Sequence, residues 1–224
     1  LGYFTTDKPY PRGELLVASD RFIKGYYTQP ELTAEKFDKD GFYATGDIME
    51  ERGTDYIVFL DRVNNVIKLS QGEFVAVSRL EADYAHAKDI RQIYIHGSSE
   101  RAFLVAVIVP SEELAAKLGA DGAGMAEVRS ALRRDLNAMA EEKQLSGYEI
   151  PRDFIVETEP FSLRNGLLTE VGKHARPNLR ARYNEELEAL YARLACDPLD
   201  ELRALRLAGA EQPVATRGAG RSRR

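Results

Sequence analysis

The chain has 224 residues, enough for one large domain or two small ones, with a globular protein's composition of 44% hydrophobic and 30% charged residues. A net charge of -5 argues against a surface dominated by nucleic-acid binding, so no nucleic-acid partner is expected. One cysteine, three scattered histidines and short apolar runs predict no internal disulfide, no metal ligands within the chain and no membrane span, and they favour a reducing compartment such as the cytoplasm.

The first 60 residues are predicted to be rich in β-strands. Residues 13–19 form a short apolar run bounded by a glycine and polar residues, which is typical of a strand. Residues 30–37 begin with a proline and predict a short helix. Asp40-Gly41 predicts a turn before a strand that starts at Tyr43, and residues 56–60 are a further strand-like run.

A short β-hairpin is predicted directly after Arg62. Residues 66–69 and 74–77 are strand-like, and Ser70-Gln71-Gly72-Glu73 between them has the length and the glycine of a hairpin loop. Ser78 and Glu81 then have the spacing of a capping box, which predicts that a helix starts there and continues to about residue 87.

The remaining pattern predicts a three-stranded sheet with helices. Strands are expected over 90–96, 103–109 and 154–156, and the second is apolar almost throughout, so it is predicted to be central and covered on both faces. Helices are expected over residues 111–118, 125–143 and 179–194, the second with an apolar stripe. Residues 212–224 contain almost no large apolar residue, which predicts disorder.

Asp47 and Arg62 are the first candidates for chemistry, because they stand at the two ends of a strand-like run, residues 56–60. A carboxylate can accept hydrogen bonds from both hydroxyls of a ribose, and a guanidinium can donate to the same ring. Taken alone, Thr45-Gly46-Asp47 is more often an ordinary turn, and Arg62 is more often part of a weak surface ion pair. Their order and spacing together predict a binding site for a nucleotide sugar.

These motifs resemble the C-terminal part of the adenylate-forming enzymes, which include acyl-CoA synthetases and carboxylic acid reductases. Residues 159–169, followed by Lys173 and Arg176-Pro177, look like the ending shared by long-chain acyl-CoA synthetases and carboxylic acid reductases. Residues 68–75 are typical of the same two groups. Residues 146–154 and the tail from Glu201 to Leu205 favour the reductases. The resemblance extends from Leu1 to about Pro213.

The resemblance implies an α+β fold in two parts. Residues 1–62 are expected to be the β-rich end of the large AMP-binding domain, and residues 63–65 a hinge. Residues 66–195 are expected to form the small C-terminal lid domain, a three-stranded sheet with flanking helices and a leading hairpin, and residues 196–224 a largely disordered linker toward a carrier domain. The chain starts at Leu1 rather than Met and lacks the family's phosphate-binding loop and acyl pocket, so we expect a fragment whose partner is the missing N-terminal adenylation core.

The resemblance also implies the reaction and the residues that perform it. The full enzyme is expected to use ATP and Mg²⁺ to form an acyl-adenylate from a carboxylic acid, to transfer the acyl group to a phosphopantetheine thiol, and to reduce it with NADPH in a domain outside this chain. Lys173 is implied to bridge the carboxylate and phosphate oxygens. Asn64 is implied to be the hinge, Lys68 to contact the acyl-phosphate region in the second step, and Gly72 to admit the phosphopantetheine arm.

One departure and several alternatives accompany this interpretation. The family's commoner version places the lysine directly after Ser/Thr-Gly, whereas Leu167 stands there and Lys173 comes six residues later. Lys173 can also be a surface lysine beside a helix start, Lys68 an edge lysine that blunts strand pairing, and Asn64 part of an ordinary loop.

Three functional alternatives remain beside the reductase. They are a long-chain fatty acid-CoA ligase, a non-catalytic binding module and an inert truncated product. Because the phosphate-binding loop and the acyl pocket are absent, the isolated chain is expected to lack acid-activating activity.

Overall fold

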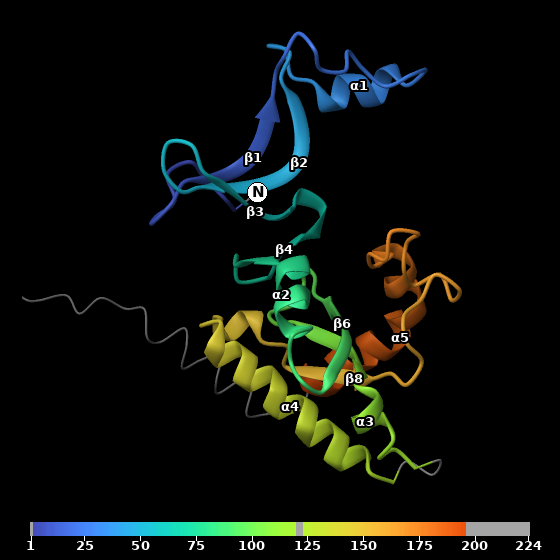
Figure 1. Ribbon diagram of the computed structural model, residues 1–224. Coiled ribbons are helices and arrows are strands. Elements are labelled where there is room, and N and C mark those ends of the chain that lie inside the picture. The colour runs from blue at the N-terminus through green and yellow to red at the C-terminus, as the bar shows by residue number, and fades with distance from the viewer. Residues whose placement is uncertain (1, 120–122, 196–224) are drawn as a thin grey trace, which may run out of the picture. The chain divides into compact units, whose positions relative to one another are not determined.

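A computed structural model of the chain describes residues 2–119 and 123–195 (Figure 1). The chain forms two compact units, Leu1–Tyr183 and Asn184–Arg224, and the sheets and the candidate site belong to the first. The fold is mixed α and β with three small sheets, as predicted. The predicted linker over residues 196–224, with its tail at 212–224, lies outside the described residues.

The first sheet is antiparallel with strand order β1-β2-β3. Its strands are β1 (Arg12–Val17), β2 (Tyr43–Glu51) and β3 (Ile57–Arg62). The predicted helical insertion is present as α1 (Pro30–Lys36), with the proline in its first turn, where a missing N–H costs nothing. Register shifts interrupt both strand pairings, one of them directly after Ile48 on β2.

The predicted hairpin follows a single turn of 3₁₀ helix, η1 (Val63–Asn65). Strands β4 (Val66–Lys68) and β5 (Phe74–Ala76) pair in antiparallel fashion. Their connection is closed by two backbone hydrogen bonds, from Leu69 N to Glu73 O at 2.8 Å and from Gly72 N to Leu69 O at 2.9 Å.

The third sheet has strand order β6-β7-β8, in β6 (Ile90–His96), β7 (Val105–Pro110) and β8 (Asp153–Val156). Strands β6 and β7 are antiparallel, and β7 and β8 are parallel. Every residue of β7 is buried, which confirms the prediction of a central strand covered on both faces.

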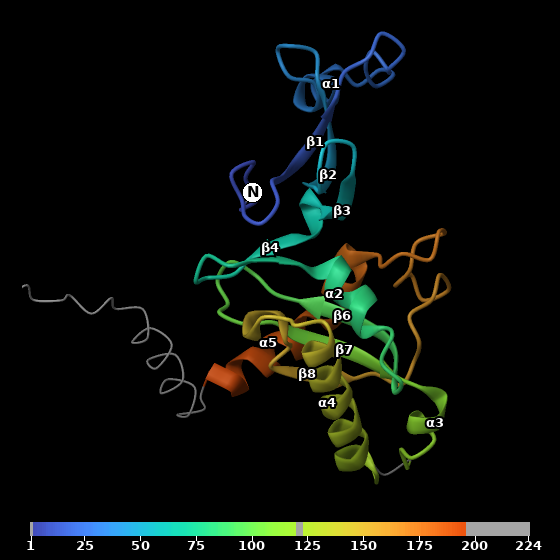
Figure 2. The same cartoon turned by 60° about the vertical axis from the view of Figure 1, so that its left-hand side comes forward.

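Two helices cover one face of this sheet, α2 (Val77–Tyr84) and α4 (Met125–Glu142) (Figure 1, Figure 2). Their buried side chains form the core with alternate residues of β6 and β7, which point to the same face. The apolar stripe predicted on the second helix is confirmed in Val128, Leu132, Leu136 and Met139. Between β7 and α4 lies a single helical turn, α3 (Glu112–Ala115), shorter than predicted.

The segment after β8 runs back to strand β6 and contacts it at Gln92. The side-chain amide of Gln92 forms two hydrogen bonds with the backbone of Phe161, donating to its carbonyl at 3.0 Å and accepting from its N–H at 2.7 Å. The ring of Phe161 contacts the rings of His174 and Tyr183. Helix α5 (Arg176–Ala195) then begins three residues earlier than predicted.

The capping box predicted at Ser78 and Glu81 is wrong. Helix α2 begins at Val77 with Ala76 before it, and no side chain of the helix caps it. The carboxylate of Asp61, at the end of β3, accepts a hydrogen bond from Ser78 N at 2.9 Å. This N–H belongs to the first turn of α2, where a capping side chain of the helix would otherwise accept it. Glu81 points into the interior instead.

Candidate functional site

The structure brings Asp47 and Arg62 together. They are register partners on the antiparallel strands β2 and β3, and Oδ1 of Asp47 lies 2.7 Å from Nε of Arg62. The register shift after Ile48 places an extra residue of β3 next to this pair, and such bulges are frequent beside functional sites. The two residues therefore face one another across a strand pair, as a common binding site for one sugar requires.

One oxygen of Asp47 is left without a hydrogen bond. Although the Asp47 side chain is 28% exposed, its Oδ1 is buried, and no group of the described residues donates a hydrogen bond to it. The 2.7 Å contact with Arg62 is an ion pair in which the N–H does not point at the oxygen. Because buried acceptors normally find a donor, the missing hydrogen bond at this ion-paired oxygen is unusual.

The part of strand β2 before Asp47 is held by strand β1. The hydroxyl of Thr45 donates to Leu15 O at 2.9 Å and accepts the hydrogen bond of Asp47 N at 3.1 Å. Glu14 accepts from Gly46 N at 3.0 Å. Thr45-Gly46-Asp47 thus lies within strand β2, at its register shift with β1, and these hydrogen bonds hold the carboxylate in place. The alternative of an ordinary turn is wrong.

Arg62 keeps its guanidinium at the surface, where the side chain is 60% exposed. Its neighbour Asp61 is only 1% exposed and serves the fold. One oxygen of Asp61 accepts from Arg62 N at 2.7 Å and from Asn65 Nδ2 at 3.3 Å, and the other accepts from Ser78 N. In the Asp-Arg motif, the acid therefore joins β3 to helix α2, and the arginine remains available to a ligand.

Asn64 lies in the 3₁₀ turn η1 and is exposed. Its φ angle is not positive, so it does not use the left-handed conformation that asparagine tolerates. The neighbouring Asn65 is the anchored residue, since its amide also donates to Ser78 Oγ at 2.8 Å. The predicted hinge at Asn64 stays a prediction.

Lys68 and Gly72 lie on the β4–β5 hairpin. The Lys68 ammonium is 5.4 Å from the centre of the Phe74 ring, a cation–π contact on an exposed face. Gly72 has φ +96°, a conformation that side chains rarely adopt, and a Cβ built on it would meet no atom within 4 Å. The backbone at Gly72 is therefore open to close approach by a ligand.

Lys173 lies in an exposed loop whose two ends are joined by a β-bridge between Leu168 and His174. Its backbone N–H donates to Thr169 Oγ1 at 3.1 Å, and its carbonyl accepts from Thr169 N at 2.7 Å. Within residues 2–119 and 123–195, the Lys173 ammonium has neither a hydrogen bond nor an ion pair, and no contact joins it to Asp47 or Arg62. The loop therefore exposes the Lys173 ammonium without a partner among the described residues.

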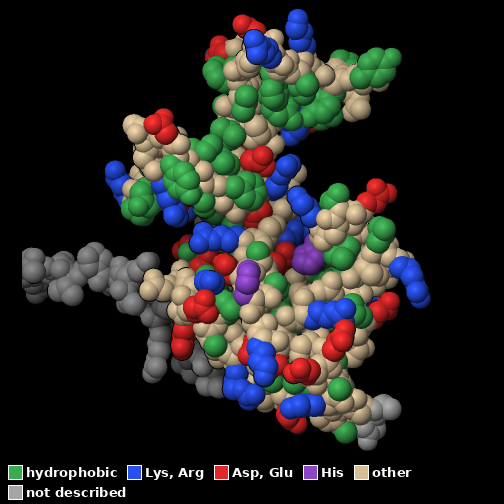
Figure 3. All heavy atoms as spheres, viewed as in Figure 1, with side chains coloured by type: hydrophobic (Ala, Val, Ile, Leu, Met, Phe, Trp, Pro, Cys, Tyr) green, Lys and Arg blue, Asp and Glu red, His purple; other side chains and the backbone are tan. Residues whose placement is uncertain are grey.

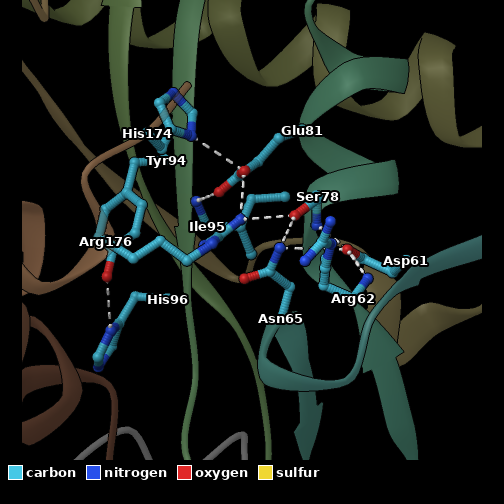
Figure 4. A network of polar contacts seen from close by, with 10 residues as sticks. All are labelled: Asp61, Arg62, Asn65, Ser78, Glu81, Tyr94, Ile95, His96, His174 and Arg176. Atoms are coloured by element: carbon cyan, nitrogen blue, oxygen red, sulfur yellow. Dashed lines mark hydrogen bonds and ion pairs between the residues drawn. The ribbon is translucent and has the colours of Figure 1, made fainter. Parts of the chain in front are cut away.

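A buried polar network that was not predicted from the sequence surrounds Glu81 (Figure 4). The Glu81 side chain is 7% exposed, and it accepts hydrogen bonds from Ile95 N at 2.8 Å, His174 Nδ1 at 3.0 Å and Arg176 Nη2 at 2.6 Å. A signal was present, because Glu81 occupies a core position of helix α2 among Val77, Leu80 and Tyr84. An acid in an apolar stripe indicates a buried partner.

Tyr94 lies beside this network. Its hydroxyl is 3.4 Å from His96 Nδ1, and the guanidinium of Arg176 lies 5.9 Å from its ring centre. Burial raises the pKa of Tyr94 to about 12, and the positive charge of Arg176 opposes that rise only in part. Tyr94 is therefore a neutral hydrogen-bonding group at physiological pH.

The described residues hold neither a metal-binding cluster nor a membrane-spanning helix. Residues 2–119 and 123–195 contain no group of three or more His, Cys, Asp or Glu side chains that could hold a metal ion. Over the same ranges, no helix combines the length and the apolar character needed to cross a bilayer.

Known proteins resemble this chain closely. No family model matches it. The carboxylic acid reductase of Segniliparus rugosus is 53% identical over 96% of the chain. Fatty acyl-CoA synthetase A of Dictyostelium discoideum is more distant, at 37% identity over 89% of the chain. The chain spans 18% of the length of that reductase and 32% of that synthetase.

Two solved structures share the fold. The A domain of the carboxylic acid reductase from Segniliparus rugosus, in complex with AMP and a co-purified carboxylic acid, has a TM-score of 0.80 and 54% identity, with 87% of this chain and 30% of that chain covered. The A-PCP didomain from the same organism, in complex with AMP, has a TM-score of 0.80 and 51% identity, with 95% and 29% covered. The predicted family and fold are confirmed: the chain belongs with the adenylation domains of the carboxylic acid reductases, within the adenylate-forming superfamily.

Proposed function

We propose that this chain contributes the ribose clamp and the catalytic lysine of a domain that activates a carboxylic acid with ATP. The observation that carries the proposal is the Asp47–Arg62 pair, which joins a buried, unsatisfied carboxylate oxygen to an exposed guanidinium. Ribose hydroxyls are donors that satisfy such an acceptor, and their oxygens accept from arginine. The AMP complexes of the A domain and of the A-PCP didomain from Segniliparus rugosus support a nucleotide as the ligand.

Lys173 is proposed to act in the first half-reaction. A carboxylate oxygen of the acid attacks the α-phosphorus of ATP, an O–P bond forms, and the bond to pyrophosphate breaks. Negative charge shifts onto the phosphoryl and bridging oxygens during this step. An ammonium on a long side chain, uncommitted and exposed as in Lys173, can stabilise that charge electrostatically.

The β4–β5 hairpin is proposed to act in the second half-reaction. The sulfur of a phosphopantetheine thiol attacks the carbonyl carbon of the acyl-adenylate, the C–O bond to AMP breaks, and the thiol proton is released. The open backbone at Gly72 suits the narrow arm, and the exposed ammonium of Lys68 suits the acyl-phosphate region. Rotation at Asn64 would exchange the two faces between the steps. The A-PCP didomain of a relative supports a carrier domain as the partner.

The remaining parts of the reaction are proposed to lie outside this chain. Several large apolar side chains of the first sheet are about half exposed, among them Leu16, Ile57 and Phe59. Figure 3 shows hydrophobic side chains gathered over the part of the chain that contains β1 and β2. We expect this surface to pack against the rest of the adenylation core, which would bind Mg²⁺ and the acid.

The full protein is proposed to be a cytoplasmic carboxylic acid reductase with NADPH reduction in a further domain. The identity of 53% to a reductase against 37% to a fatty acyl-CoA synthetase favours it over the CoA ligase. We expect the isolated chain to be inactive. Acid-dependent exchange of pyrophosphate into ATP by the purified chain would contradict this expectation.

The proposal is tested by substitution of the clamp in the full-length enzyme. In Asp47→Ala and Arg62→Ala, the KM for ATP in acid-dependent pyrophosphate exchange is expected to rise on the order of tenfold or more, because hydrogen bonds to charged groups are lost. Glu51→Gln, an exposed acid at the end of the same strand β2, is the matched control. An unchanged KM in both clamp variants would refute the assignment.

A further inference from the structure

Glu81 accepts hydrogen bonds from three groups that lie outside its own helix. It stands on helix α2, whereas Ile95 is on β6, and His174 and Arg176 lie more than ninety residues away, at the end of the Lys173 loop and the start of α5 (Figure 4). An ionised carboxylate is acceptor-only, so Nδ1 of His174 carries the proton of their hydrogen bond. All three groups therefore donate to one buried anion.

These contacts fix the base of the loop that carries Lys173. His174 is the next residue in the chain, and it also closes the loop through its bridge to Leu168. Arg176 begins helix α5 and binds Glu81 at 2.6 Å. The backbone on the C-terminal side of Lys173 is thus anchored to helix α2, while the ammonium itself has no partner among the described residues.

The network continues to the segment that follows Arg62. Arg176 Nη2 also donates to Ser78 Oγ at 3.1 Å, and the same oxygen accepts from Asn65 Nδ2 at 2.8 Å. Asn65 in turn donates to Asp61. A continuous series of hydrogen bonds therefore leads from the end of β3 through α2 to the Lys173 loop.

We propose that Glu81 is a positioning residue for acid activation, which holds the Lys173 loop in register with helix α2 and with the segment after Arg62. This inference rests on the proposed role of Lys173 and deepens it. Burial of a carboxylate lowers the stability of the fold unless the charge is well paired. If position 81 contributed to stability alone, an apolar side chain could serve there equally well. A positioning role requires a charged acceptor that fixes the directions of the donors on His174 and Arg176. Small displacements of a catalytic group lower the rate strongly.

The test compares the two half-reactions in the full-length enzyme carrying Glu81→Gln. Acid-dependent pyrophosphate exchange is expected to fall on the order of 10- to 100-fold, since the loop loses its anchor. Reaction of a pre-made acyl-adenylate with the thiol, which does not use Lys173, is expected to be unchanged. Asp83→Asn is the matched control, because it removes one negative charge from the same helix. Among the described residues, the Asp83 carboxylate pairs only with Arg79, at 3.9 Å. It is expected to leave both half-reactions unchanged.

Variants on the partner side keep the test decisive if Glu81→Gln does not fold. Arg176→Lys retains the charge without the guanidinium fork, and His174→Gln retains a donor with a different geometry. Each is expected to show the same selective loss of pyrophosphate exchange with a melting temperature close to that of the parent. Equal loss in both half-reactions, or no loss in a folded variant, would overturn the positioning role.

Lys173→Ala separates this inference from the proposed function. If pyrophosphate exchange survives in Lys173→Ala, the role of the lysine is wrong and the positioning role falls with it. If exchange is lost in Lys173→Ala but intact in folded Glu81→Gln, only the positioning role is overturned.

Discussion

Thr169 forms two hydrogen bonds with the backbone of Lys173. The Thr169 hydroxyl accepts from Lys173 N at 3.1 Å, and Thr169 N donates to the Lys173 carbonyl at 2.7 Å. The main chain at Lys173 is therefore fixed at a loop tip, and Gly172 before it adopts a positive φ of 75°. A long flexible side chain on a fixed backbone can reach outward without moving the loop.

We expect Lys173→Ala to abolish acyl-adenylate formation and to spare the reaction of a pre-made acyl-adenylate with thiol, because the proposed role of the ammonium is to stabilise charge in the first step only. The two rates are measured separately in the full-length enzyme by pyrophosphate exchange and by thioester formation. Lys88→Ala, an exposed lysine in another loop, is the control. Equal loss of the two steps would refute the division of labour between the Lys173 loop and the hairpin.

Asp61→Asn is expected to destabilise the chain by about 1–3 kcal/mol, because an amide has only one oxygen to offer. Asp61 accepts from Ser78 N on one oxygen and from Arg62 N and Asn65 on the other, so the amide nitrogen must face a donor in either orientation. Denaturant unfolding measures the change. An unfolding free energy equal to that of the parent would show that these bonds contribute nothing net.

Gly72→Ala is expected to cost roughly 1–2 kcal/mol of stability through backbone strain, and to slow thiol transfer more than acid activation. Gly53→Ala is a matched control, since Gly53 has φ +98° against +96° and equally open space around it, but lies in the turn between β2 and β3. Stability is measured by denaturant unfolding and the two half-reactions by their separate assays. A similar slowing in both variants would assign the effect to strain alone.

We expect the folded chain to lose stability at alkaline pH because of Tyr94. Burial raises its pKa to about 12, so between about pH 10 and 12 the unfolded chain loses this proton while the folded chain keeps it. The unfolded state is then favoured, and the unfolding free energy falls as the pH rises through that window. Tyr94→Phe removes this contribution, so unfolding curves of the variant are expected to depend less steeply on pH there. Identical pH profiles would contradict the assignment.

Local patterns predicted those parts of the fold in which neighbouring residues determine the outcome. The apolar run of β7 predicted a central strand, and the four-residue loop with Gly72 predicted a hairpin. Asp47 and Arg62 could be paired from sequence because a short connection between two strands makes them antiparallel neighbours.

Glu81 shows why the rest could not be predicted. Its spacing from Ser78 matches a local cap, but its partners His174 and Arg176 lie more than ninety residues along the chain, where no local pattern reaches. The same contacts explain the early start of α5, since Arg176 is fixed at its first position. The cap itself is replaced by Asp61, a residue of another element.

The hydrogen bonds of Asp61 with Asn65 and with Ser78 cross position 64 of the chain. If the small domain turns about that position, these bonds act as a latch: they must open before the turn and can close again only when it is reversed. The two orientations would then be discrete states separated by a barrier, so exchange between them, rather than bond making at phosphorus or carbon, becomes a candidate for the slow event in turnover.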